Sequence, residues 1–200
     1  MKRTLLAGLL ASLSSVASAS IFDLNINDDS FRIAVGGQLS KMFDVSKGQF
    51  DLGVLSKRGD DNSGDLTQGH FGILLTGDAG AKQADVVAGL GVRFMGTDFD
   101  SPKIGDVTGG AIGLGGQVEF RIPQLNRLGA VLYGYGAPSA TSISDIDRYT
   151  ELGASIDYQV IRDASIYLGY RNIRYTAEVA GNDTTVTADT GFHAGLRLNF

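Results

Sequence analysis

The stretch Gly191-Phe192-His193-Ala194-Gly195-Leu196-Arg197-Leu198-Asn199-Phe200 closes the sequence. Its apolar residues alternate with polar or small ones, which is the period of a β-strand with one apolar and one polar face. A strand of about ten residues is long enough to cross the apolar core of a bilayer. The terminal aromatic is typical of the C-terminal pattern by which outer-membrane proteins are recognised for assembly. The stretch therefore predicts a membrane-spanning strand and an assembly signal made of Phe192, Leu196, Leu198 and Phe200.

The first residues predict export. Met1-Lys2-Arg3 is basic, Leu5 to Leu13 is apolar apart from small residues, and Ala17-Ser18-Ala19 has the A-x-A form of a cleavage site. These features predict a secretory signal peptide over 1–19, because the apolar part is too short for a spanning helix. A retained membrane anchor is the alternative. Cleavage after Ala19 leaves 20–200 as one outer-membrane β-barrel domain.

Composition excludes several classes of protein. The 200 residues carry a net charge of −5, and no basic patch suited to nucleic acid is present. With no cysteine, no disulfide supports the fold. The 28 glycines disfavour helices. Beyond the signal peptide no apolar run reaches the length of a transmembrane helix.

Ten segments alternate in polarity and predict strands. Together they indicate an all-β, antiparallel, up-and-down transmembrane β-barrel of about ten strands, or of eight if the first two segments lie elsewhere. A soluble β-sandwich or lipocalin-like barrel is the competing interpretation. The phase of the seventh segment is ambiguous, and the phase of the ninth breaks after Arg171. The segments are Phe22–Ile26, Phe31–Gly36, Phe50–Val54, His70–Thr76, Val86–Phe94, Ile112–Arg121, Leu128–Ala137, Glu151–Val160, Ile166–Arg171 and Gly191–Phe200.

The connections alternate between short and long. Short periplasmic turns and longer extracellular loops are typical of outer-membrane barrels. The tight first hairpin, Asn27 to Ser30, is an exception on the outer side. The predicted periplasmic turns are Arg162–Ala164, Pro123–Asn126 and Gly80–Gln83, and the predicted outer loops are Ala180–Val186, Pro138–Asp147, Thr97–Val107 and Lys57–Leu66.

Aromatic residues gather near both ends of the predicted strands, as expected for the two interfacial belts of a membrane barrel. The periplasmic belt is predicted to contain Phe22, Phe50, Phe120, Tyr158, Tyr167 and Phe200, and the outer belt Phe31, Phe71, Phe94, Tyr135, Tyr149 and Tyr175.

Five motifs follow one another along the chain: Gly113-Leu114-Gly115-Gly116, the turn Ile122 to Arg127, Tyr135-Gly136-Ala137-Pro138, the run Ala164 to Arg171, and the closing stretch from Gly191. In this order and spacing they resemble the YfaZ family of outer-membrane proteins. The resemblance implies an outer-membrane barrel of a Gram-negative bacterium. It implies no established activity and no known catalytic residues, so no residue role follows from it.

The predicted inner face is charged. Its main candidates are Arg32, Asp51, Arg93, Glu119, Arg121, Glu151, Asp157, Arg171 and Arg197. Charges inside a narrow barrel must pair, because an isolated buried charge is costly. They are expected to form a structural ion-pair network, and the alternative is a charged constriction that selects small solutes. Both histidines, His70 and His193, are expected to be satisfied residues of the lumen.

Three functional classes follow: a structural or surface-interaction barrel with a narrow, charge-paired lumen, a small porin-like diffusion channel, and a barrel lipid hydrolase. The first is favoured, because no catalytic set is visible; no cofactor or metal site is predicted. The acidic outer loops are expected to be solvated and to oppose aggregation, and the alternative is weak divalent-cation binding at the anionic lipopolysaccharide surface. The expected partners are outer-membrane lipids, lipopolysaccharide, and the barrel assembly machinery and periplasmic chaperones during biogenesis. Nucleic acid is not an expected partner, and the oligomeric state stays open.

Overall fold

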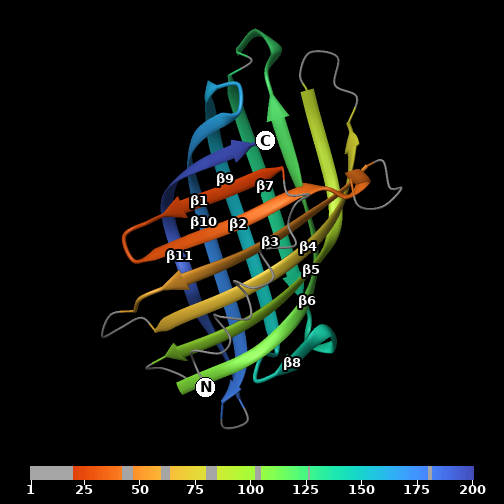
Figure 1. The fold of residues 1–200 in the computed structure, drawn as a ribbon. Helices are drawn as coiled ribbons and strands as arrows, with labels where there is room; N and C mark the ends of the chain where they lie inside the picture. Colours follow the sequence, from red (N-terminus) through yellow and green to blue (C-terminus); the bar gives the residue numbers. More distant parts are fainter. Residues whose placement is uncertain are drawn as a thin grey trace.

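The structure, a computed structural model, describes residues 20–41, 47–59, 64–79, 85–101, 105–125, 127–179 and 182–200 (Figure 1). The predicted signal peptide, 1–19, and the predicted turn Gly80–Gln83 lie outside the described residues. No helix in the described part of the chain is long and apolar enough to cross a membrane.

Strands make up almost all of the described chain. The three short 3-10 turns are η2 (Leu39–Lys41), η3 (Pro123–Leu125) and η4 (Ser139–Thr141). The strands are β1 (Ile21–Ile26), β2 (Ser30–Gln38), β3 (Gly48–Lys57), β4 (Asp65–Asp78), β5 (Asp85–Ser101), β6 (Gly105–Arg121), β7 (Leu128–Ala137), β8 (Ser142–Ser144), β9 (Arg148–Ile161), β10 (Ala164–Val179) and β11 (Asn182–Asn199).

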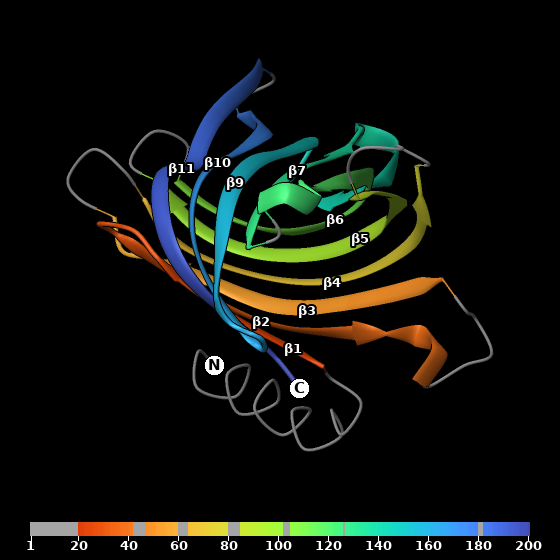
Figure 2. The ribbon, with the colours of Figure 1, turned by 90° about the horizontal axis from the view of Figure 1, so that it is seen from above.

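Ten of these strands form a closed antiparallel barrel, which confirms the predicted architecture and the higher of the two strand counts. Each wall strand pairs with the next, and β11 returns to pair with β1 from Ile21↔Asn199 to Ile26↔Ala194. The short β8 lies in the connection after β7 and pairs with β6 only. Seen from above, β1 to β6 follow one another around one side and β9 to β11 cross on the other (Figure 2).

The barrel has two different ends. The C-terminal end is where β11 finishes and β1 begins, and the hairpin end is where β10 and β11 meet at Val179↔Asn182. β11 has 18 residues and β1 only 6, so the wall is much lower at β1 than at β11. Figure 1 shows β11 rising past the short first strands toward the label C.

Two predicted outer loops are largely strand. The β5–β6 ladder continues to Ser101↔Gly105, and the β10–β11 ladder continues to Val179↔Asn182. The predicted loops Thr97–Val107 and Ala180–Val186 are therefore wrong over most of their length. Polar residues such as Asp98 and Thr185 suggested loops, but they face outward from strands whose backbone groups pair with each other.

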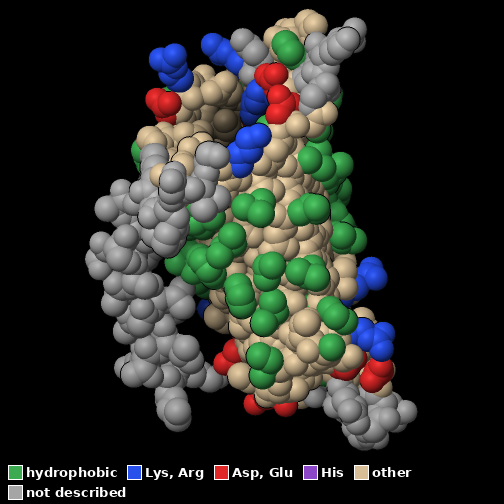
Figure 3. Space-filling view, turned by 90° about the vertical axis from the view of Figure 1, so that its right-hand side faces the viewer, with side chains coloured by type: hydrophobic (Ala, Val, Ile, Leu, Met, Phe, Trp, Pro, Cys, Tyr) green, Lys and Arg blue, Asp and Glu red, His purple; other side chains and the backbone are tan. Residues whose placement is uncertain are grey.

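The outer surface carries an apolar band. Leu90 is 77% exposed, Leu168 70% and Phe192 81%. Figure 3 shows hydrophobic side chains over the middle of one face, with Lys, Arg, Asp and Glu side chains toward both ends. On β9 the band runs from Leu152 to Val160, roughly 27 Å along the strand and roughly 20 Å of bilayer at a tilt of about 40°. An apolar surface this large needs lipid around it.

Four predicted belt tyrosines point inward instead. Tyr135, Tyr149, Tyr167 and Tyr175 are all buried. Each lies an even number of residues from an inward side chain on the same strand, as Tyr149 lies two residues from Glu151, and so it points inward too. The belt was predicted from the position of each aromatic along its strand, and that position does not show which face of the strand the side chain is on. The remaining aromatics include two outward cross-strand contacts, Phe71–Phe94 with ring centroids 6.4 Å apart and Tyr170–Phe192 at 5.3 Å.

Inward glycines make room for these rings. Tyr133 lies against Gly153 and Tyr167 against Gly195, each directly opposite on the neighbouring strand. A Cβ at either glycine would collide with the ring. The glycine content therefore reflects close cross-strand approach inside a crowded barrel.

Toward the hairpin end the polarity of the strands reverses. On β10, Ile173 and Tyr175 are buried inside while Arg174 faces outward and is exposed. The alternation of sides continues through this point, although a β-bulge between Ile173 and Arg174 shifts the pairing with β11. The predicted phase break after Arg171 is therefore wrong. The inward and outward positions stay the same, but the outer face becomes polar where the strand has left the lipid.

Candidate functional site: the barrel interior

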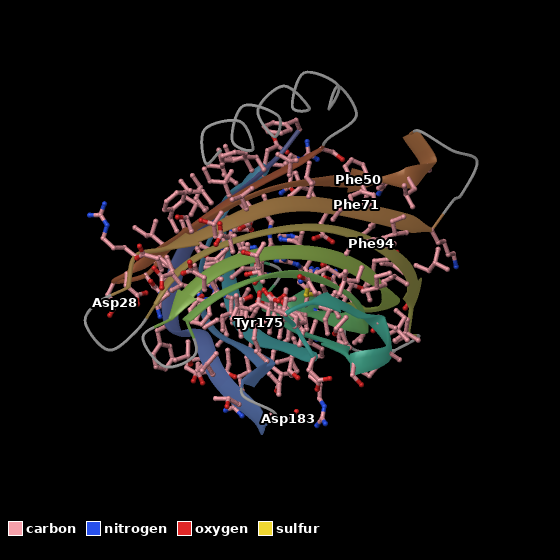
Figure 4. All side chains as sticks on the ribbon, turned by 90° about the horizontal axis from the view of Figure 1, so that it is seen from below. Asp28, Phe50, Phe71, Phe94, Tyr175 and Asp183 are labelled. Atoms are coloured by element: carbon pink, nitrogen blue, oxygen red, sulfur yellow. The ribbon has the colours of Figure 1, made fainter. Side chains whose placement is uncertain are left out.

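The hairpin half of the interior is filled by apolar side chains, here called the apolar plug. Tyr175 lies at its centre, with ring centroids 5.2 Å from Tyr149 and 6.4 Å from Phe99. Figure 4 shows Tyr175 inside the ring of strands, whereas Phe50, Phe71 and Phe94 mark β3, β4 and β5. The plug contains Leu55, Leu66, Met95, Phe99, Val107, Ala111, Tyr135, Ala137, Ile146, Tyr149, Ile173, Tyr175, Ala177, Val186 and Ala188, all buried.

Hydrogen bonds fasten the polar tips of the plug. The Tyr175 hydroxyl donates to Gln68 Oε1 at 2.6 Å, and Gln68 Nε2 donates to the Tyr149 hydroxyl at 3.2 Å. The Tyr149 hydroxyl donates in turn to Glu151 Oε2 at 2.6 Å. This chain satisfies the buried hydroxyls and links the plug to the charged layer below it.

That layer is a buried cluster around Glu151. Arg93 Nη1 lies 3.1 Å from Glu151 Oε2, and Arg32 Nη1 lies 3.5 Å from Oε1. Arg93 Nη2 also reaches Asp51 Oδ2 at 3.2 Å, and His70 Nε2 lies 2.8 Å from the same oxygen. The guanidinium of Arg93 covers the ring of Tyr135, 3.9 Å from its centroid. Five strands are cross-linked at this level, so the cluster braces the wall.

A second buried cluster lies beside the seam between β11 and β1. Arg171 Nε donates to Asp189 Oδ2 at 2.7 Å, with both side chains at most 2% exposed. Its two Nη atoms donate to Asn25 on β1 at 3.0 Å and to Ser30 on β2 at 3.3 Å. Lys57 Nζ donates to the carbonyl of Ala188 at 3.2 Å. These contacts join β11 to the short strands where the backbone ladder with β1 has already ended.

Toward the C-terminal end the ion pairs become partly exposed. Arg121 Nη2 lies 2.9 Å from Asp157 Oδ2, and Arg197 Nε lies 3.1 Å from Asp23 Oδ2. Glu119 accepts a hydrogen bond from Gln117 at 3.1 Å.

These groups line a cavity of about 540 Å³ in the C-terminal half of the barrel. Its wall comes from the ends of strands that meet there, such as Ile21, Arg121 and Asn199, and includes Tyr133, Tyr167 and His193. The members of the apolar plug beyond the charged layer do not line it. Among the described residues the cavity therefore ends at the charged layer, and it is called the vestibule from here on.

All nine charged residues singled out from the sequence face this interior. The structure brings Arg32, Asp51, Arg93 and Glu151 into one cluster, pairs Arg121 with Asp157, and gives Arg171 and Arg197 partners in Asp189 and Asp23. Glu119 accepts a hydrogen bond from Gln117. Asp189 was missed because the last strand was predicted to begin only at Gly191. Its parity with His193 was the available signal, since the bulge that shifts the pairing lies before it, at Ala188.

The histidines lie in different surroundings. His70 is part of the Glu151 cluster through Asp51. His193 meets the edge of Tyr167, with centroids 5.9 Å apart, and its Nδ1 has no hydrogen-bond partner among the described residues. No group of three or more His, Cys, Asp and Glu residues in the described ranges is arranged to hold a metal ion.

The chain matches the sequence model of one protein family over its whole length. The model described as "YfaZ precursor" matches residues 1–200. The chain belongs to the YfaZ family. With its closed wall and apolar outer band, this YfaZ-family protein is an integral outer-membrane β-barrel protein of a Gram-negative bacterium.

Solved structures similar to the YfaZ-family chain share little sequence with it. A KdgM porin in complex with disordered oligogalacturonate is 10% identical, with 91% of this chain and 99% of that chain covered and a TM-score of 0.45. The outer membrane channel DcaP of Acinetobacter baumannii is 9% identical, with 89% and 54% covered and a TM-score of 0.40. No curated protein matches the sequence.

Proposed function

We propose that this protein is a non-conducting barrel that anchors a strand-built outer surface in the outer membrane. The observation that carries this proposal is the apolar plug. It fills the hairpin half with side chains at most 7% exposed, and a dry constriction of this kind opposes the passage of water and ions.

The proposed orientation places the C-terminal end in the periplasm. Two connections at that end are short, namely 162–163 between β9 and β10 and 122–127 with η3 between β6 and β7. The extended β5–β6 and β10–β11 hairpins lie at the other end, as expected for the outer side. The signal peptide 1–19 directs export. Assembly machinery and chaperones then read Phe192, Leu196, Leu198 and Phe200, whose side chains lie on the lipid side or at the strand end and remain accessible.

The surface role rests on carboxylates around the hairpin end. Asp65, Asp100 and Asp106 stand directly opposite one another on β4, β5 and β6 and are exposed. Like charges in such a row repel unless cations screen them. Divalent cations would screen this row and join it to the phosphates of lipopolysaccharide, which is the proposed lipid partner alongside the outer-membrane lipids.

We further propose that the protein is not an enzyme. The charged groups inside the described barrel serve one another as hydrogen-bond partners across strands, which suits bracing better than proton transfer to a substrate. Lipid hydrolysis by the purified, folded barrel would contradict this assignment.

A small diffusion channel is the second candidate, and the vestibule of about 540 Å³ favours it. It requires displacement of the plug. A liposome-swelling assay with arabinose separates the two candidates: proteoliposomes should swell no faster than protein-free liposomes. Swelling in proportion to the amount of folded barrel would replace the proposed function with a channel.

A further inference from the structure

We infer that the vestibule is a binding site for an uncharged saccharide of about two rings, taken up from the periplasm. The inference rests on the proposed closed barrel, because a ligand in a cavity with one opening must enter and leave through the periplasmic end. Its volume of about 540 Å³ falls within the roughly 300–1,000 Å³ of typical small-molecule sites.

The charge of the wall excludes strongly charged ligands. Arg32, Arg93, Arg121 and Arg197 line the vestibule, and Asp23, Asp51, Glu119 and Asp157 line it as well. The two signs are interleaved in pairs, such as Arg197 with Asp23. An anion that reaches one of these arginines therefore also meets a carboxylate, and a cation meets the reverse, so both lose affinity relative to a neutral ligand.

The hydrogen-bonding groups of the wall suit hydroxyls. Arg197 lines the cavity and uses its Nε for Asp23, so its guanidinium has further N–H groups with which to donate. Gln159 and Asn199 add amides at the open end. His193 lines the cavity as well, although its unpartnered Nδ1 is itself buried. A sugar hydroxyl both donates and accepts, so one ligand can satisfy this mixed set.

One tyrosine supplies a flat platform. The ring of Tyr133 rests against Gly153, which has no side chain to hold it away from the wall. The ring therefore packs close to the wall, and it is one of the groups that line the vestibule. An aromatic face offers the C–H surface of a pyranose ring an apolar contact, which an ionic wall alone does not provide.

The test uses the fact that the chain has no cysteine. Gln117→Cys introduces a thiol on the vestibule wall of the otherwise unchanged full chain, refolded into liposomes. Labelling by a small uncharged methanethiosulfonate reagent is followed with and without 100 mM maltose. We expect maltose to slow labelling at least threefold, and digalacturonate, an anionic disaccharide of similar size, to slow it much less.

A matched variant locates the effect. Tyr133→Leu in the Gln117→Cys background should abolish most of the protection, whereas Tyr158→Leu on the lipid face should retain it. The heat-modifiable gel shift shows that each variant is folded. Unchanged labelling with maltose, or equal protection by both disaccharides, overturns the inference while leaving the closed barrel intact. Labelling from both ends of the barrel would instead refute the proposed function.

Discussion

Breaking the Arg171–Asp189 pair should weaken the barrel far more than breaking an exposed pair. The buried pair is 2.7 Å long, with exposures of 2% and 1%. Arg171→Met removes this contact and the bonds to Asn25 and Ser30, and it leaves Asp189 charged and without its cation. Loss of one partner of a buried pair costs about 3–5 kcal/mol.

The matched control is Arg148→Met at the hairpin end. Arg148 lies 3.4 Å from Asp183, but the two side chains are 62% and 55% exposed, so its loss should cost at most about 1 kcal/mol. Equilibrium urea unfolding in phospholipid vesicles, read by tyrosine fluorescence and by the gel shift, measures both values.

A double variant separates the pair from its surroundings. Arg171→Met combined with Asp189→Leu removes the isolated charge, and should therefore recover at least about 2 kcal/mol relative to the sum of the two single variants. Additive effects, or a cost for Arg171→Met no larger than that of Arg148→Met, would refute this account. In it, side-chain contacts hold the strands together beyond Ile26↔Ala194, the last backbone pair between β1 and β11.

Three further predictions concern other parts of the chain. Leu168→Arg, at a side chain 70% exposed in the apolar band, should destabilise the inserted barrel by about 2–4 kcal/mol, whereas Arg174→Leu on the same face beyond the band should not. Equal urea midpoints for the two variants would contradict the assigned boundary of the lipid. Gly195→Val should force the Tyr167 ring from its seat and cost about 1–3 kcal/mol, while Gly96→Val, with open space around its Cβ, should cost less; the same two unfolding curves decide this. N-terminal sequencing of protein from outer membranes should begin at Ser20, and a first residue at Met1 would show that 1–19 is retained.

The lipid-facing alternation was predictable wherever strands carry aliphatic residues at every second position. β9 and β11 are such cases, and their outward sets from Leu152 and Phe192 follow the sequence pattern. β7 was ambiguous because Val131, Leu132 and Tyr133 are consecutive apolar residues. The register with β9, which no local pattern contains, turns Leu132 outward and Tyr133 inward.

The apolar plug was not predicted, because an alternating pattern does not state which face meets lipid. In Asp98-Phe99-Asp100 the apolar residue points inward, although Phe94 on the same strand points outward. Such a change of polarity without a change of strand was a signal that β5 leaves the bilayer. The pairs within the interior depend on the shear of the whole barrel, so the sequence predicted the charged face but not the partners of Arg171 or Arg93.

Single-channel recording in planar bilayers tests the closure of the lumen most directly. Wild-type protein should give no conductance steps above baseline, and a variant with both Phe99 and Tyr175 changed to Ala should give discrete steps, because the two rings at the centre of the plug are removed. Large porin-like steps from wild-type protein that the double variant leaves unchanged would contradict the closed barrel.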